Sequence, residues 1–353
     1  MGKSRQRNHE TPRFLLNRFA SRVEGAEKRW VWRIGCDGSV RELSTRDVGV
    51  SKRFYGDGST GVEDALAIAE GPFSEILASI DGGRAPEAFS EELRQLFWTL
   101  AARTRAIRKQ LATVADALLF KLAAWSETGG ARDEAVEYLQ STFDERVEKI
   151  VAPFSPEQRR RALALARAPA VREQFLKQAM EHVRSNFGPM VGLVVRMVQD
   201  RGILPSSVRE AQINSLASLL SRGAPPDGFK PEAWHVISAD RHSFNLGDGC
   251  VFAKLKDGGL CSLLKDSKNW SEVYLPISDR QVLVATRGRG RPSLDDATLI
   301  NQASACLSSD YIYSSCCGTA ARDLIALIGT REPLLSQDEL TEIVTRGFRA
   351  REV

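Results

Sequence analysis

The sequence predicts an α+β protein with a small, mostly antiparallel β region built from both ends of the chain and a large helical insert between them. Short runs of alternating apolar and polar residues lie near both ends, whereas apolar residues recur every three or four positions from about 87 to 222. A proline- and glycine-containing stretch at 224–228 separates the two patterns. The N-terminal strands are too few to be stable alone, so we expect them to join the C-terminal strands across the insert.

Composition limits the class of protein. Of the 353 residues, 42% are hydrophobic and 27% are charged, and the net charge is +4, so the chain is globular and its charge permits an anionic partner without requiring one. No run of about 18 apolar residues occurs and the polar start lacks a secretory h-region, so we expect a cytoplasmic protein that enters no membrane. The six cysteines match neither a zinc site nor a disulfide framework.

The N-terminal segment, residues 1–86, is predicted to be β-rich with one helix. The runs at 30–34 and 39–43 flank a turn at Cys36-Asp37-Gly38 and predict a hairpin. Thr60 and Glu63 have the spacing of a capping box and predict the start of a helix. Gly71-Pro72 is expected to end it, which would place Glu70 in its last turn.

The middle segment, residues 87–223, is predicted to be a helical bundle. Its first helix is expected to run unbroken from about 90 to 128. A later helix should start at Ser155 and break at Pro169, and Phe187-Gly188-Pro189 is expected to end another. A last helix over 207–222 should end at Gly223.

The C-terminal segment, residues 224–353, is predicted to be a β region with closing helices, packed with residues 1–86. The strands and helices are expected at the following positions: strands near 234–237, 242–246, 250–254, 272–275 and 281–286, and helices near 319–328 and 337–347.

Several of these features occur together in one known family. Residues 9–20 read HETPRFLLNRFA, and a WVW strand at 30–32, Phe54-Tyr55 and a helix carrying two glutamates follow in order. This pattern resembles the domain-of-unknown-function family 4238. The stretch 246–249, LGDG, is similar to a turn of that family, and Asp248 is the one residue of the turn that matches. Because the family has no established role, the resemblance implies an architecture and no activity.

Four residues at these family-like positions could form one polar site. His9, Glu63, Glu70 and Asp248 would supply an imidazole and carboxylates for general acid–base chemistry. Each also has a structural alternative. Glu63 could close a capping box, Asp248 could hold a tight turn, and His9 could bind backbone groups at the first strand.

Glu70 requires a compensating partner if it lies at the end of its helix, where the helix dipole disfavours a carboxylate. A nearby arginine and a catalytic or metal-binding role are equally open explanations. Glu63 and Glu70 would lie on one helix face about 10 Å apart, too far for one metal ion. They could flank a substrate or two divalent metal ions, so the cofactor remains open between a divalent metal and none.

Arginines at 287, 289 and 291 form a second candidate site. The sequence Arg287-Gly288-Arg289-Gly290-Arg291-Pro292 resembles an AT-hook, whose arginines enter the minor groove of DNA. The alternative is a solvated loop after the strand that ends at 286. Basic residues of the helices could add to a cationic surface for phosphates together with Lys3, Arg5 and Arg7, or could simply be solvated. These helix residues are Arg103, Arg105, Arg108, Lys109, Arg159, Arg160 and Arg161.

Two functions follow from these residues. The first is a nucleic-acid-acting hydrolase of the nuclease type, with Glu70 as base or metal ligand, His9 as acid–base partner, and Glu63 and Asp248 in support. The second is a non-catalytic module that binds nucleic acid or protein through its long helices. Motifs for kinases, NTPases, dinucleotide-binding proteins and α/β-hydrolases are missing, and the sequence does not indicate an oligomeric state.

Overall fold

The fold is taken from a computed structural model of the whole chain. The structure describes residues 7–25, 28–52, 62–201, 203–222, 228–239, 243–331, 334–336, 338–339 and 342. The chain divides into two compact units. The first comprises residues 1–112 and 207–336, and the second comprises residues 113–206 and 337–353.

The first sheet joins the two ends of the chain, as the sequence predicted. Its strands run in the order β2 (Arg22–Glu24), β3 (Lys28–Gly35), β12 (Tyr311–Ser314) and β7 (Leu246–Gly247), and β4 (Val40–Ser44) pairs with the same strand β3. β3 and β4 form the expected antiparallel hairpin. In the antiparallel pairing of β3 with β12, Ile34 lies opposite Ile312. A contact between residues nearly 280 positions apart therefore holds the β region together.

The remaining strands form a second five-stranded antiparallel sheet and a short ribbon. The sheet contains, in spatial order, β6 (Ala233–Ser238), β11 (Gln281–Thr286), β10 (Trp270–Pro276), β8 (Phe252–Leu255) and β9 (Leu260–Cys261). The ribbon pairs β1 (Arg7–His9) with β5 (Val50–Lys52). The predicted strand at 242–246 is reduced to the two residues of β7, and 240–242 lie outside the described residues.

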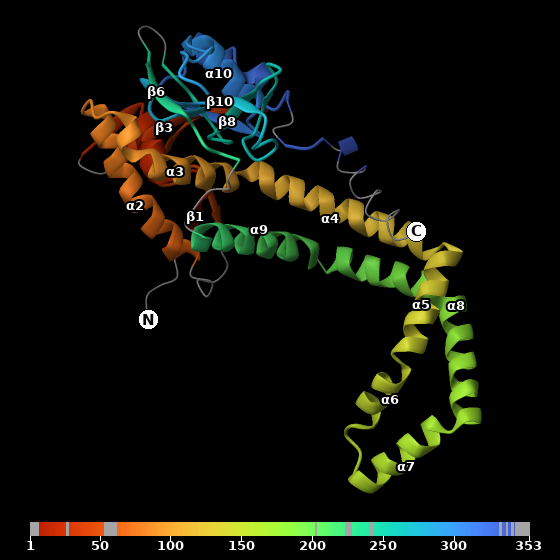
Figure 1. The fold of residues 1–353 in the computed structure, drawn as a ribbon. Helices are drawn as coiled ribbons and strands as arrows, with labels where there is room; N and C mark the ends of the chain where they lie inside the picture. The colour runs from red at the N-terminus through yellow and green to blue at the C-terminus, as the bar shows by residue number, and fades with distance from the viewer. Residues whose placement is uncertain are drawn as a thin grey trace. The chain divides into compact units, whose positions relative to one another are not determined.

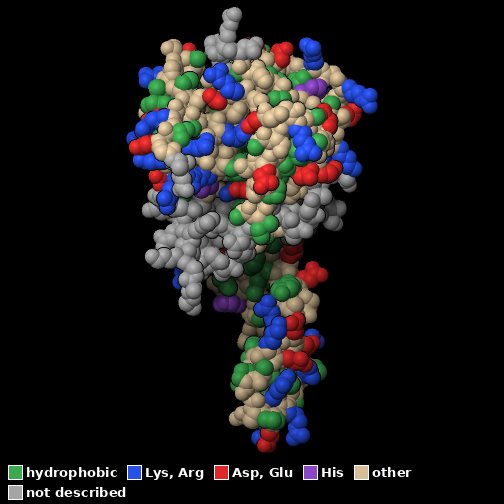
Figure 2. Space-filling model, turned by 90° about the vertical axis from the view of Figure 1, so that its left-hand side faces the viewer, with side chains coloured by type: hydrophobic (Ala, Val, Ile, Leu, Met, Phe, Trp, Pro, Cys, Tyr) green, Lys and Arg blue, Asp and Glu red, His purple; other side chains and the backbone are tan. Residues whose placement is uncertain are grey.

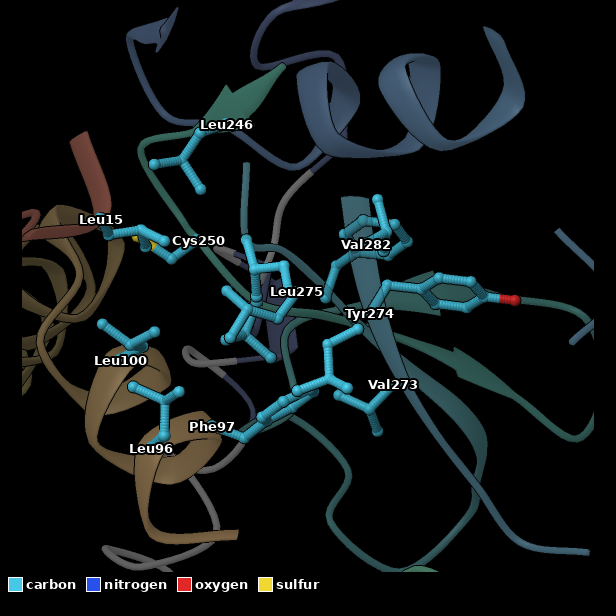
Figure 3. Close-up of a cluster of buried hydrophobic side chains, with 14 of the residues drawn as sticks. Leu15, Leu96, Phe97, Leu100, Leu246, Cys250, Val273, Tyr274, Leu275 and Val282 are labelled. Carbon is cyan, nitrogen blue, oxygen red and sulfur yellow. The ribbon is translucent and has the colours of Figure 1, made fainter. Parts of the chain in front are cut away.

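One large hydrophobic core lies within the first unit. Figure 3 shows Leu96, Phe97 and Leu100 of α3 (Ser90–Ala102) facing Val273 and Leu275 of β10. The core also takes Ile300 from α10 (Ala297–Cys306), a helix that the sequence reading missed. In Figure 1, α3 and α10 lie on opposite sides of the β-rich region. Helices thus cover the strands on two sides.

The helix α2 (Val62–Asp81) continues past the point where the sequence predicted its end. Pro72 lies inside it. A proline within a helix removes one backbone hydrogen bond at a cost of about 3 kcal/mol. Here the residues after Pro72 offset that cost, because Phe73, Leu77 and Ile80 are all buried in the core. The expected stop at Gly71-Pro72 is therefore wrong, and Thr60 lies outside the described residues.

The predicted unbroken helix after residue 90 is divided into two. The helix α3 ends at Ala102, and α4 (Arg105–Ser126) begins after a break at Arg103-Thr104. The break leaves backbone carbonyls without helical partners, and the carbonyl of Thr104 accepts a hydrogen bond from Gln212 Nε2 (3.4 Å). Gln212 belongs to α9 (Ile203–Arg222), close to the predicted last bundle helix.

Helices make up the described part of the second unit. They are α5 (Gly129–Ser141), α6 (Phe143–Val151), α7 (Pro156–Arg167) and α8 (Pro169–Asp200), together with parts of α4 and α9. Ser155 forms the predicted capping box of α7 with Gln158, and the chain breaks at Pro169 as expected. The predicted end at Phe187-Gly188-Pro189 is wrong, because α8 continues through Pro189.

Short elements complete the chain. They are α1 (Arg13–Leu16), α11 (Thr319–Arg322) and three 3₁₀ turns at Asn17–Phe19, Pro86–Phe89 and Ile325–Leu327. The predicted closing helix at 319–328 therefore appears as two short turns. Most of the second, at 337–347, lies outside the described residues, as do Phe54-Tyr55 and 224–227. No described helix is long and apolar enough to cross a membrane.

Candidate functional site

Arg103 lies at the break between α3 and α4 and connects two of the predicted site residues. Its side chain is only 5% exposed, and it forms an ion pair with the carboxylate of Glu70, which is 19% exposed. The same guanidinium donates a hydrogen bond to the backbone carbonyl of His9. A buried guanidinium is stable only when its charge is paired and its N–H groups are bonded. Arg103 thus fastens α2 and β1 to the helix break.

Glu70 lies in the middle of α2 because that helix extends to Asp81. The prediction that Glu70 occupies a last helical turn is therefore wrong, and the helix dipole does not act against it there. Of the two explanations left open by the sequence, the structure supplies the arginine. Glu63 lies near the start of the same helix, and its side chain lies outside the described part of the chain.

His9 ends the short strand β1, opposite Val50 of β5. Burial lowers the pKa of its imidazole to about 4, and the positive charges of Arg103 and Arg13 act in the same direction. A backbone hydrogen bond with Val48 opposes this shift. Nδ1 is buried and has no hydrogen-bond partner among the described residues. His9 is therefore neutral at pH 7, with one ring nitrogen unused.

Asp248 follows β7 and holds a turn of the chain before β12. Its carboxylate accepts backbone hydrogen bonds from Ser309 (2.6 Å), Asp310 (2.7 Å) and Tyr311 (3.2 Å). Burial raises the pKa of Asp248 to about 6, although these three hydrogen bonds act in the opposite direction. The acceptor atoms of Asp248 are thus occupied by the backbone.

The acidic and basic side chains around these residues neutralise one another. Glu10 pairs with Arg108, and Asp310 pairs with both Arg105 (3.1 Å) and Lys109 (2.6 Å). Together with the pair of Arg103 and Glu70, these pairs engage the four predicted phosphate-binding cations that lie between 103 and 109.

Cys250, two residues after Asp248, is a buried residue for which the sequence indicated no special role. It is buried with a positive φ of 53°, an unusual backbone conformation for a residue other than glycine. Burial raises the pKa of its thiol to about 12; the nearby charge of Asp248 acts in the same direction and that of Arg103 opposes it. His9 and Glu70 therefore meet at Arg103, whereas the carboxylate of Asp248 is bonded to the backbone of residues 309–311.

A small pocket lies beside the helix break, and it is lined by neither His9, Glu70 nor Asp248. Its lining includes Thr104, Gly247 and Cys250, and it leaves about 10 Å³ for the centre of a water molecule. That is room for a single water, far from the several hundred Å³ of a typical ligand site. The chain is closely packed at Gly247, where a side chain would collide with Ser304 and Ser308. Among the described residues, no group of three or more His, Cys, Asp or Glu could hold a metal ion.

The three arginines of the 287–291 loop have different surroundings. The Arg287 guanidinium lies 4.4 Å above the ring of Trp270 and donates to the carbonyls of Gly228 (2.6 Å), Ser267 (3.4 Å) and Lys268. Arg289 and Arg291 are exposed. Only the latter two present their side chains to solvent.

Comparison with known protein families gives a match. A family model described as a protein of unknown function, DUF4238, matches residues 7–202, more than half of the chain. The chain belongs to this family. The DUF4238 match includes His9, Glu63 and Glu70 and stops before Asp248. No curated protein and no solved structure matches the chain significantly.

Proposed function

We propose that this DUF4238 protein is a non-catalytic protein-interaction module. In this proposal the polar residues of the first unit brace its β structure, and the helices of residues 113–206 carry the contact surface. The observation that carries this proposal is the segment of α8 at residues 189–198. Apart from Arg196, the segment has apolar residues or glycine on every side, and one of these sides is exposed to solvent. A helix of this kind is normally buried on all sides.

The bonding of the candidate site residues supports the bracing role. Glu70 is paired with a buried arginine, and the carboxylate of Asp248 is bonded to three backbone N–H groups. A catalytic carboxylate must be able to exchange these partners for substrate or metal. Releasing either one would leave buried donors or a buried charge without a partner, at a cost of a few kcal/mol.

The charge distribution favours a protein partner over nucleic acid. The cations at 103, 105, 108 and 109 are all paired with carboxylates. Figure 2 shows Lys and Arg side chains interspersed with Asp and Glu on the face that it presents. Nucleic-acid binding relies on cations gathered on one surface.

Apolar side chains are unusually exposed in the second unit. Eight large ones with at least 48% exposure lie on α4 and α6 to α8 or the turn after α6: Phe120, Ile150, Phe154, Leu165, Phe175, Met190, Leu193 and Val194. Single exposed apolar residues are ordinary, whereas several within a unit of fewer than 120 residues indicate a surface that another molecule covers.

His9 favours a second candidate function, metal-independent cleavage of a phosphodiester. A neutral imidazole with an unused Nδ1 can accept a proton, and the adjacent Arg103 guanidinium could stabilise a developing negative charge. Its low pKa makes His9 a weak base. We therefore rank this function second.

The two proposals differ in a direct assay. Purified protein and the variants His9→Gln and Glu70→Gln are incubated with RNA and with DNA, in Mg²⁺, in Mn²⁺ and in EDTA. The interaction module predicts no cleavage by any of the three proteins. Cleavage by the parent that is lost in His9→Gln, with circular dichroism showing an intact fold, would overturn the module and establish the hydrolase.

A further inference from the structure

The helix α8 has two apolar sides between Gly188 and Val198. On one side Gly188 and Val195 are buried. Gly188 lies against the carboxylate of Glu127, where a side chain would collide, and the adjacent Phe187 ring packs edge-on against Trp125 with centroids 6.1 Å apart. This side is occupied by the second unit itself.

The other side carries four apolar residues in contact with solvent. Met190 is 55% exposed, Leu193 53%, Val194 55% and Met197 39%. Steps of three, one and three residues place all four on one face of a helix. We call these four residues the α8 stripe. None of them is charged or polar, so covering the stripe would desolvate no charge.

We propose that the α8 stripe is the seam of a homodimer, in which α8 packs antiparallel against α8 of a second copy about a two-fold axis. This inference rests on the proposed function and supplies its partner. In a two-fold contact the same patch serves both copies, so the patch must be complementary to itself.

The order of residues in the stripe meets this requirement. Read in either direction, the pattern is a methionine, an aliphatic residue three positions on, a second aliphatic residue directly after it, and a methionine three positions further. With the axis between residues 193 and 194, Met190 faces Met197 of the second copy, and Leu193 faces Val194. Large flexible side chains thus meet at the ends, and two branched aliphatic residues meet in the middle. A different partner would not require this symmetry.

The packing of helices in the second unit is a further argument for a second copy. In the described part of the chain, α5 packs against α6 and α8, and α7 packs against α6 and α8. These contacts leave the stripe side of α8 exposed. A stable helical core needs a second layer to bury the free side of the first. Two copies joined along α8 would provide one for each other, as in a four-helix bundle.

Analytical ultracentrifugation of the full-length chain tests the seam. The parent is expected to pass from monomer to dimer as its concentration rises. Met190→Lys and Met197→Glu should each shift the dissociation constant at least tenfold towards monomer. In the double variant M190K/M197E, the introduced lysine and glutamate face each other twice across the axis, and dimerisation should return. Leu299→Lys, which alters a 47% exposed residue of α10 in the first unit, is the matched control and should dimerise like the parent.

The outcomes separate this inference from the proposed function. A parent that stays monomeric at every concentration, or single variants that dimerise normally, would overturn the seam. Single variants that are monomeric without rescue in the double variant would overturn the antiparallel arrangement. A monomer that also shows no nuclease activity overturns the seam alone and leaves the module with a different protein or a lipid surface as its partner. The stripe residues are exposed in the single chain, so these variants should fold, which circular dichroism checks.

Discussion

The Arg103 guanidinium holds the Glu70 carboxylate with one nitrogen and the His9 backbone carbonyl with another. Two residues that the sequence suggested as catalytic partners are thus connected through an arginine that is 5% exposed. The connection joins β1, α2 and the break between α3 and α4, three elements that are distant in the chain. Such an arrangement fits a structural brace better than a site that must exchange ligands during turnover.

Asp248→Asn should destabilise the protein by about 3 kcal/mol. An amide has one acceptor oxygen in place of two, so at least one of the backbone N–H groups of Ser309, Asp310 and Tyr311 would face an NH₂ group. Urea unfolding measures the loss. Asp257→Asn is the matched control, since Asp257 caps an exposed turn at Gly259 and its change should cost less than about 1 kcal/mol. Equal effects of both changes would contradict the anchoring role of Asp248.

Arg287→Ala should lower the free energy of unfolding by about 2 kcal/mol, because it removes hydrogen bonds to three carbonyls and the contact with Trp270. Arg289→Ala is the control in the same loop and should stay within about 0.5 kcal/mol of the parent. Thermal melts of both variants check the difference. If the two variants melted alike, the loop would depend less on Arg287 than its contacts indicate.

His9 should make the protein sensitive to acid. The pKa of the folded imidazole, about 4, lies below the ordinary 6.5, so the unfolded chain takes up a proton first and stability is lost as the pH falls from 6.5 to 4. Asp248 acts in the opposite direction, because its folded pKa of about 6 lies above 3.8. Urea unfolding of the parent and of His9→Gln between pH 7 and pH 4.5 separates the contribution of His9 from that of Asp248. The stability advantage of the parent should shrink as the pH falls, and a constant advantage would contradict the assignment to His9.

The sequence predicted much of the fold where local patterns and the final packing agree. The hairpin of β3 and β4 has alternating residues around a glycine turn, and the capping box at Ser155 is complete within four residues. The prediction from sequence failed where packing overrides a local signal. Pro72 and Pro189 both lie inside helices. After Pro72 the helix continues because Phe73, Leu77 and Ile80 are buried in the core.

The sequence suggested structural roles for Asp248 and Glu70 but did not identify their bonding partners. Local patterns pointed to Asp248 as a turn residue and to an arginine as one explanation for Glu70. Nothing local identified that arginine as Arg103, 33 positions further on, because the partner depends on how α2 packs beside the helix break. The sequence could not predict the positive φ of Cys250 or the raised pKa of its thiol either, since both depend on the surroundings that the fold provides.

The central claim, that the polar cluster braces the fold and does not catalyse a reaction, is tested most directly by a double-mutant cycle on Glu70 and Arg103. The free energy of unfolding is measured in urea for the parent, Glu70→Gln, Arg103→Gln and the double variant. We expect each single change to cost about 3 kcal/mol and the pair to show a coupling energy of about 1–3 kcal/mol. A Glu70→Gln variant as stable as the parent, or more stable, would contradict the claim, because that result is typical of a carboxylate kept for function at the expense of stability.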